Sequence, residues 1–207
     1  MYQLYCARNT YAMGAHVLLE ELGVAYEICE VDLGLDQQSD DFMLASPHGR
    51  VPALRYSHGA IFESNAIALY LTDTHADRGL SIVPDHSLRA PYLQWLFYLS
   101  STVQPEVLIQ FHPEYYFTDV ATQTVFRNAS MERLLAIWQI LDMAYATDPD
   151  SPWLFDQRPT AVDFCLAIQI QWSECFDDTI DRFPYLAGLL RAMKTRPAFE
   201  KVMRWHQ

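Results

Sequence analysis

Hydrophobic residues in the first third of the chain recur at two different spacings. Where every second residue is apolar the pattern predicts a strand, and where apolar residues lie three and four apart it predicts a helix. In chain order the segments are a strand at 2–6, a helix at 11–22, a strand at 25–33, a short helix at 40–46, strands at 51–56 and 59–62, and a helix at 64–75. The order β-α-β-α-β-β-α predicts an α/β domain over residues 1–77 whose sheet ends in a hairpin.

The remainder of the chain shows helical spacing only. The stretch RGLSIVPDH breaks the periodicity with a glycine and a proline, which indicates a linker at residues 78–86. Residues 87–207 are expected to form an all-helical domain. Its helices are expected at 87–111, at 119–146, and from near Thr160, Pro184 and Pro197. The sequence TAVD, which starts at Thr160, resembles a capping box that would satisfy the first amides of a buried helix.

Charge and hydropathy exclude several classes of partner. Asp and Glu outnumber Lys and Arg by 26 to 14, giving a formal net charge of −12, and no basic run could follow a phosphate backbone, so no nucleic acid partner is expected. The longest apolar region, residues 92–111, is interrupted by Gln94, Ser100 and Pro105, so no membrane association is expected either. The N-terminus lacks the basic start and apolar block of a signal peptide, and we expect a cytoplasmic protein.

The cysteines and histidines are not spaced like metal ligands. Cys6, Cys29, Cys165 and Cys175 form no Cys-x-x-Cys pair, and the 7 histidines show neither His-Glu-x-x-His nor His-x-His spacing. We therefore expect reduced thiols in the protein interior and no bound metal.

The most informative stretch is SPHGRVPALRYSHGAIFESNAIALYL, residues 46–71. A cis bond between Val51 and Pro52 would turn the backbone N–H and C=O of Val51 outward, free to pair with an extended ligand. Glu63 and Ser64 precede an apolar helix, where a carboxylate can accept an ammonium group while a hydroxyl and helix amides receive a carboxylate. Together these residues indicate a receptor for the head group of an α-amino acid.

Several stretches of the sequence resemble those of a known family. SPHGRVPAL followed by FESNAIALYL resembles the glutathione-binding motif of the glutathione transferases, with Ser46 where the family usually has Asn. TAVDF is similar to the family's capping box, and FPYLAGLLRAMKTRPAFEKVM is similar to its last helices. The resemblance covers nearly the whole chain. It implies a thioredoxin-like α/β domain followed by an all-α domain, a cytosolic homodimer, and glutathione as co-substrate.

The resemblance also implies roles for individual residues. Val51, before a cis Pro52, would pair with the cysteinyl backbone of glutathione. Glu63 and Ser64 would hold the ammonium and carboxylate of its γ-glutamyl end. Arg50 would lie near the ligand backbone or the glycyl carboxylate, which a guanidinium binds well.

Three residues are candidates for activating the thiol of glutathione. A thiol with a pKa of ~8.5 is only slightly ionised at neutral pH, so the protein must stabilise the thiolate. In CARNTYAMG, Thr10 aligns best with the hydroxyl of Ser-type family members, and Tyr11 with the position of the Cys-type class. Asn9 is a third candidate, because Asn and Thr donors occur here in bacterial relatives that reduce disulfides.

The acceptor substrate is expected between the two domains, along the first long helix. Apolar walls and a few polar groups are provided there by Trp95, Tyr98, Gln104, Phe111, His112, Tyr115 and Tyr116. Bacterial relatives of the Cys type carry a His-Lys pair nine and ten positions after the helix Trp, where this chain has Gln104 and Pro105. The leading hypothesis is conjugation of glutathione to a small hydrophobic electrophile. The alternatives are glutathione-dependent reduction of disulfides or peroxides and a non-catalytic binding protein.

Overall fold

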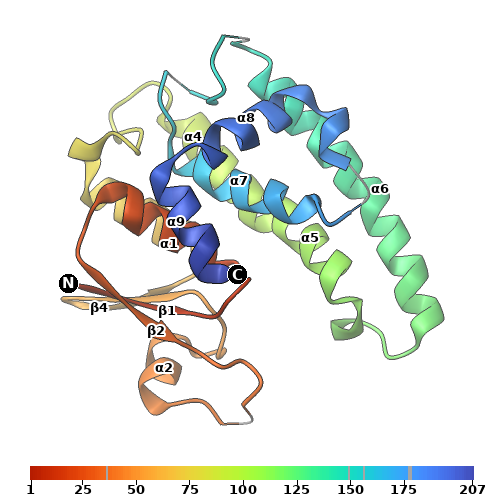
Figure 1. The fold of residues 1–207 in the computed structure, drawn as a ribbon, viewed down its shortest axis with the longest axis horizontal. Coiled ribbons are helices and arrows are strands. Elements are labelled where there is room, and N and C mark those ends of the chain that lie inside the picture. Colours follow the sequence, from red (N-terminus) through yellow and green to blue (C-terminus); the bar gives the residue numbers. More distant parts are fainter. Residues whose placement is uncertain (36, 149, 156, 177–178) are drawn as a thin grey trace. The chain divides into compact units, whose positions relative to one another are not determined.

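The computed structural model describes residues 1–35, 37–148, 150–155, 157–176 and 179–207 (Figure 1). The chain separates into two compact units. The first contains Met1–Arg89 together with Met193–Gln207, and the second contains Ala90–Ala192.

The first unit is built on a four-stranded mixed sheet. Its strands are β1 (Tyr2–Cys6), β2 (Tyr26–Glu30), β3 (Ala53–Tyr56) and β4 (Gly59–Phe62), and its sequential helices are α1 (Ala12–Leu22), α2 (Asp40–Ala45) and α3 (Ser64–Thr74). The strand order is β2-β1-β3-β4. The first pair is parallel, and the other two pairs are antiparallel. The predicted order of elements and the late hairpin are confirmed.

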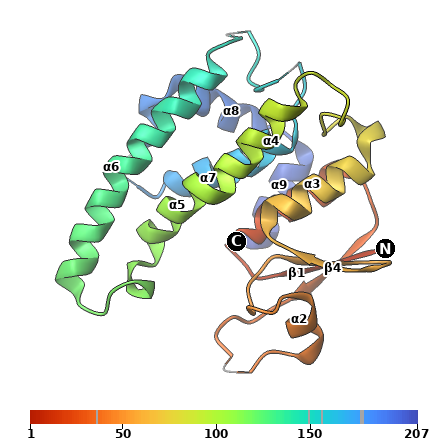
Figure 2. The same ribbon diagram turned by 180° about the vertical axis from the view of Figure 1, so that it is seen from behind.

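The helices of this unit form layers on the two faces of the sheet (Figures 1 and 2). Both α1 and α3 lie on one face, while the short α2 lies on the other and buries Phe42 against it. The apolar side chains of α1 are almost all buried. This burial is the physical reason why apolar residues recur at helical spacing in this segment. The helix ends at Gly23, whose φ of 64° is the left-handed conformation that closes helices most easily in glycine.

The last helix of the chain, α9 (Pro197–His206), belongs to this first unit and packs along α1 (Figure 1). Its apolar side buries Phe199 and Val202 completely. Ion pairs join Arg196 to Glu21 and Lys201 to Glu20 at the same contact. This grouping differs from the expected helical domain of residues 87–207, because helical periodicity shows that a face is apolar without showing what covers it.

The second unit is helical throughout its regular elements, as expected. Its helices are α4 (Arg89–Tyr98), α5 (Gln104–Phe111), α6 (Val120–Tyr145), α7 (Ala161–Ser173) and α8 (Pro184–Lys194), with short 3₁₀ turns at Pro113–Tyr115 and Thr179–Arg182. A further 3₁₀ turn, Ala76–Arg78, follows α3 in the first unit. The most buried helix is α7, and the predicted capping box at its start is present between Thr160 and Asp163. No described helix is long and apolar enough to cross a membrane.

The predicted single helix at 87–111 has an irregular centre. Leu99–Val103 form a π-helical turn between α4 and α5. Pro105 lacks an amide hydrogen and its ring crowds the carbonyl four residues earlier, so a regular α-helix cannot pass this point. A π turn is one way in which a helical path absorbs such a mismatch.

Candidate functional site

The strand register brings three loops of the first unit to one edge of the sheet. Tyr5 of β1 pairs with Ala53 of β3, and Ala53 pairs in turn with Phe62 of β4. The chain therefore leaves β1, enters β3 and leaves β4 at the same edge. The segments that meet there are the loop at 7–11, the Val51–Pro52 bond and the start of α3.

The Val51–Pro52 peptide bond is cis, as the resemblance implies. Pro52 is buried next to the start of β3, whereas Val51 is half-buried. Within the described part of the chain, no hydrogen bond occupies the backbone N–H or C=O of Val51. Its backbone can therefore pair with a ligand.

Ser46 shapes the turn that leads into this bond. Its hydroxyl donates to the backbone C=O of Arg50 at 2.7 Å and accepts from the Arg50 N–H at 3.1 Å. The side chain thus closes the five-residue turn from both sides. The serine replaces the family's usual Asn in a structural position, and the Arg50 side chain lies exposed beyond it.

The start of α3 presents the predicted carboxylate and hydroxyl. Glu63 is exposed and has a φ of 73°, an uncommon conformation for a residue with a side chain. Ser64 is the first residue of α3 and only 9% exposed. An exposed carboxylate thus adjoins a helix N-terminus, where the first amides have no partner within the helix and an anion is also favoured.

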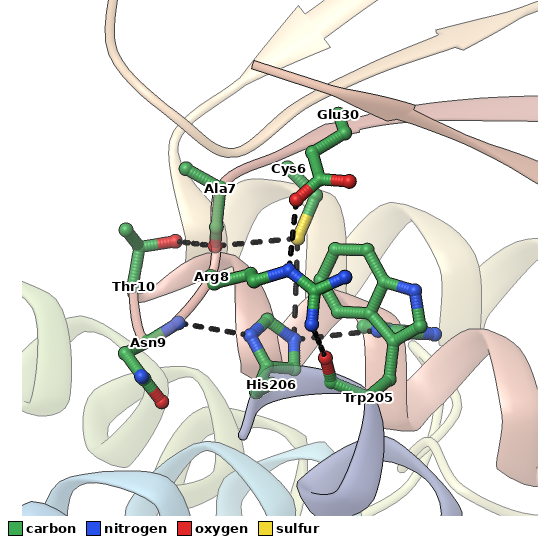
Figure 3. A network of polar contacts seen from close by, with 9 residues as sticks. Cys6, Ala7, Arg8, Asn9, Thr10, Glu30, Trp205 and His206 are labelled. Atoms are coloured by element: carbon green, nitrogen blue, oxygen red, sulfur yellow. Dashed lines mark hydrogen bonds and ion pairs between the residues drawn. The ribbon is translucent and has the colours of Figure 1, made fainter. Parts of the chain in front are cut away.

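The loop at 7–11 holds the three candidate thiol-activating residues (Figure 3). The hydroxyl of Thr10 donates its hydrogen to the backbone C=O of Ala7 at 2.7 Å. Asn9 has a left-handed φ of 51°, and its backbone N–H donates to Nδ1 of His206 at 3.1 Å. The Asn9 side chain points away from this network (Figure 3). Tyr11 is half-buried immediately before α1.

Cys6 and Cys165 are poorly suited to act as nucleophiles. Burial, with Glu30 nearby, raises the pKa of the Cys6 thiol to about 12, and burial also raises the pKa of Cys165 to about 12. Both groups are therefore neutral at physiological pH. All four cysteines are free thiols, but the expectation of interior positions is wrong for Cys175, which is exposed.

Sequence reasoning missed a buried cluster beneath the loop. Cys6 of β1, His16 of α1 and His206 of α9 bring Sγ and two ring nitrogens within 4.8 Å of one another. His16 and His206 are 3% and 1% exposed. A buried histidine on the apolar stripe of a predicted helix was the available signal, but its partner lies 190 residues away in sequence.

The residues expected to line the acceptor site belong to the second unit. Tyr98 ends α4 and makes an edge contact with Trp95, and Oε1 of Gln104 accepts a hydrogen bond from Gln169 at 3.4 Å. Phe111 is 39% exposed. His112 stacks on Tyr115, and its Nδ1 lies 2.9 Å from Glu114. Their role in acceptor binding stays a prediction.

Comparisons with known proteins agree with this architecture. Residues 1–73 match the family model for the glutathione S-transferase N-terminal domain. The chain is 26% identical to glutathione S-transferase GstA of Escherichia coli O157:H7, over 97% of this chain and 96% of that protein. It is 28% identical to the disulfide-bond oxidoreductase YfcG of Escherichia coli K12, over 96% and 92%.

A solved structure shows the same fold over the whole chain. The glutathione S-transferase of a sphingomonad, complexed with glutathione, superposes with a TM-score of 0.85 at 23% identity, covering 99% of this chain and 98% of that one. The predicted fold, a thioredoxin-like domain followed by an all-α domain, is confirmed. With the motif, the family model and the full-length relatives in agreement, residues 1–73 match the glutathione S-transferase N-terminal domain family, and the whole chain is similar to full-length glutathione transferases.

Proposed function

We propose that this protein binds glutathione at the sheet edge described above, stabilises its thiolate and transfers it to a small hydrophobic electrophile. The observation that carries the proposal is the register of Tyr5, Ala53 and Phe62, which gathers the loop at 7–11, the Val51–Pro52 bond and the start of α3. The match of residues 1–73 to the glutathione S-transferase N-terminal domain and the glutathione complex of the sphingomonad protein support it.

Each part of glutathione has a matching group at this edge. The free backbone N–H and C=O of Val51 would pair with the cysteinyl backbone, as in strand addition. The Glu63 carboxylate would accept the γ-glutamyl ammonium. Ser64 and the first amides of α3 would receive the adjoining carboxylate, and Arg50 would meet the glycyl end.

The hydrogen bonds of the loop alter the order of the candidate thiol donors. A hydroxyl has one hydrogen to donate, and that of Thr10 is directed to the Ala7 carbonyl. We therefore place the Asn9 side-chain amide first, because it is exposed and directed away from the internal network (Figure 3). Thr10, after a hydroxyl rotation, and Tyr11 follow it.

The proposed reaction is attack of the glutathione thiolate on an electrophilic atom. A carbon–sulfur bond forms while a leaving group departs with its electron pair or a π bond takes up the electrons and then a proton. Tyr98, Gln104, Phe111 and His112 are proposed to contact this electrophile.

A second candidate function is glutathione-dependent disulfide reduction, which the relationship to YfcG favours. Two molecules of glutathione would be oxidised to one glutathione disulfide, while the substrate disulfide is reduced to two thiols. The loop at 7–11 contains no cysteine, and the neighbouring Cys6 is buried. The attacking sulfur in this route is therefore also that of glutathione.

An ultraviolet titration of the protein with glutathione across pH tests the proposed site. Saturable thiolate absorbance is expected, with the bound thiol pKa below its free value of ~8.5. Asn9→Ala is expected to raise that pKa by about 1 unit, since a hydrogen bond to a charged group contributes about 1.5–3 kcal/mol. Glu63→Gln is expected to weaken binding by about 10- to 100-fold for the same reason.

The controls separate the donors and the two functions. Glu132→Gln, which removes an exposed carboxylate from α6, is expected to leave affinity unchanged. A raised thiol pKa in Thr10→Val or Tyr11→Phe, with none in Asn9→Ala, would show that the donor is misassigned. Product analysis with electrophiles and disulfides then distinguishes a conjugate from glutathione disulfide. Absence of glutathione binding in the unaltered protein contradicts both functions.

A further inference from the structure

Two buried histidines, which the proposed reaction does not use, lie directly beneath the candidate thiol site. Nδ1 of His16 lies 3.4 Å from Nε2 of His206, and Sγ of Cys6 lies 4.0 Å from the same nitrogen. His206 occupies the last turn of α9, and His16 lies on the buried face of α1. The hydrogen bonds at the two ends of this cluster determine where its protons are.

The hydrogen bond from the loop at 7–11 determines which ring nitrogen of His206 carries hydrogen. The backbone N–H of Asn9 donates to Nδ1 of His206 at 3.1 Å, so Nδ1 presents its lone pair (Figure 3). Burial lowers the pKa of His206 to about 4, so the ring is neutral at pH 7 and carries one hydrogen. That hydrogen is therefore on Nε2, which faces His16.

The hydrogen bonds of Tyr26 independently determine which ring nitrogen of His16 carries hydrogen. The hydroxyl of Tyr26 donates to the carboxylate of Glu20, and Nζ of Lys201 also approaches that carboxylate, at 2.7 Å. Having given its hydrogen away, the Tyr26 oxygen accepts from Nε2 of His16 at 2.9 Å. Nδ1 of the neutral His16 ring is thus left with a lone pair that faces the Nε2–H of His206.

With these tautomers, the Nε2–H of His206 donates to Nδ1 of His16. The tautomers give one continuous direction of hydrogen bonds, from the Asn9 N–H through His206 and His16 to Tyr26 and Glu20. The same proton positions argue against a metal ion among Cys6, His16 and His206. A metal on Nε2 of His206 would require the ring hydrogen to move to Nδ1, where it would oppose the Asn9 N–H.

A second set of contacts joins the same loop to the same helix turn. The guanidinium of Arg8 donates to the backbone C=O of Trp205 at 2.6 Å and lies 4.7 Å from the centre of the Trp205 ring (Figure 3). Nε of Arg8 also pairs with Glu30 at 2.9 Å. Adjacent residues 8 and 9 are thus attached to adjacent residues 205 and 206.

We propose that His206 is a positioning residue for the glutathione thiolate: its ring holds the Asn9 backbone in the left-handed conformation that directs the loop at 7–11 toward the ligand. The proposal rests on the proposed function. The ring acts through Asn9 and does not touch glutathione. The hydrogen-bond chain beneath it keeps Nδ1 as the acceptor, since a ring with hydrogen on Nδ1 would repel the Asn9 N–H. The C-terminal helix thereby determines the geometry of a loop near the N-terminus.

Nuclear magnetic resonance of the unaltered protein tests the proton assignment without glutathione or substitutions. Proton–nitrogen correlations of the ¹⁵N-labelled histidine rings are expected to show hydrogen on Nε2 in both His16 and His206. Slow hydrogen exchange at the Asn9 amide is expected as well. A His206 ring with hydrogen on Nδ1, or binding of one equivalent of Zn²⁺ by the cluster at neutral pH, overturns the proposal.

Substitutions test the positioning role through the pKa of bound glutathione. His206→Phe keeps the ring shape but removes the acceptor, and it is expected to raise the bound thiol pKa by about 1 unit. His206→Asn replaces Nδ1 with an amide oxygen at the same branch of the side chain, and it is expected to restore most of the lowered pKa. His58→Phe, at an exposed histidine in the β3–β4 turn, is the matched control and is expected to change nothing.

The outcomes separate this proposal from the proposed function. If unaltered protein lowers the thiol pKa and a folded His206→Phe variant lowers it equally, only the positioning role fails. If His206→Asn resembles His206→Phe, the acceptor at Nδ1 is not what matters and the proposal fails. If unaltered protein binds no glutathione, the proposed function fails, and the role given to His206 fails with it.

Discussion

At the scale of single residues, Asp163 is the polar group with the most consequences for stability. Its fully buried carboxylate accepts from the backbone N–H of Leu154 and Thr160, the hydroxyl of Thr160 and the hydroxyl of Tyr145, at 2.7–3.0 Å. Asp163→Ala leaves these buried donors without an acceptor. We expect the free energy of unfolding to fall by about 3–5 kcal/mol, measured by urea denaturation.

Tyr145→Phe is the matched control for this carboxylate, because it removes one of the four donors and keeps the ring. A loss of about 1–2 kcal/mol is expected. Equal losses in Asp163→Ala and Tyr145→Phe would contradict the view that the carboxylate organises several groups at once. The capping box was predictable from TAVD, but the contributions of Leu154 and Tyr145 were not, since both come from outside the helix.

At the scale of elements, the contact between α1 and α9 is expected to make stability depend on pH. Burial lowers the pKa of both His16 and His206 to about 4; Lys201 and Arg8 act in the same direction, and Glu20 opposes it. The unfolded chain therefore binds protons on these rings before the folded chain does. Their contribution to the free energy of unfolding is fully present above pH ~6.5. It is lost as the pH falls toward 4, by about 1.4 kcal/mol per pH unit for each histidine.

Urea denaturation at several values between pH 6.5 and 5 measures this slope above the range in which most carboxylates titrate. His206→Phe is expected to remove about half of the slope, because one titrating ring remains. A slope that is unchanged in this variant would mean that other groups cause the pH dependence. His58→Phe, at an exposed histidine, again provides the comparison.

At the scale of the whole molecule, net charge bears on the homodimer that family resemblance implies. Each copy carries a formal charge of −12, so two copies repel each other at low ionic strength. We predict a homodimer whose dissociation constant falls as salt is raised toward ~0.15 M, because the Debye length shortens to about 8 Å. Sedimentation velocity at several protein and salt concentrations measures this. A monomer at every condition contradicts the prediction.

The sequence by itself determined the features that depend on neighbouring residues. Alternating and helical spacing predicted the order from β1 to α3, and the prolines marked where α8 and α9 begin. The motif around Val51 and Glu63 predicted both the cis bond and the family match of residues 1–73. These features follow from local steric preferences, side-chain periodicity and a short recognisable motif, so they could be read without a structure.

The tertiary structure alone decided which distant segments meet. It placed α9 on α1, joined His206 to Asn9 across 197 residues, and directed the Thr10 hydroxyl to Ala7. It also buried His16 beside Cys6 although no spacing indicated a cluster. Hydrophobic periodicity shows that a face will be buried but does not identify its partner, and a side chain's hydrogen bonds depend on that partner. For this reason the candidate thiol donors could be named from sequence, whereas the network that holds them could not.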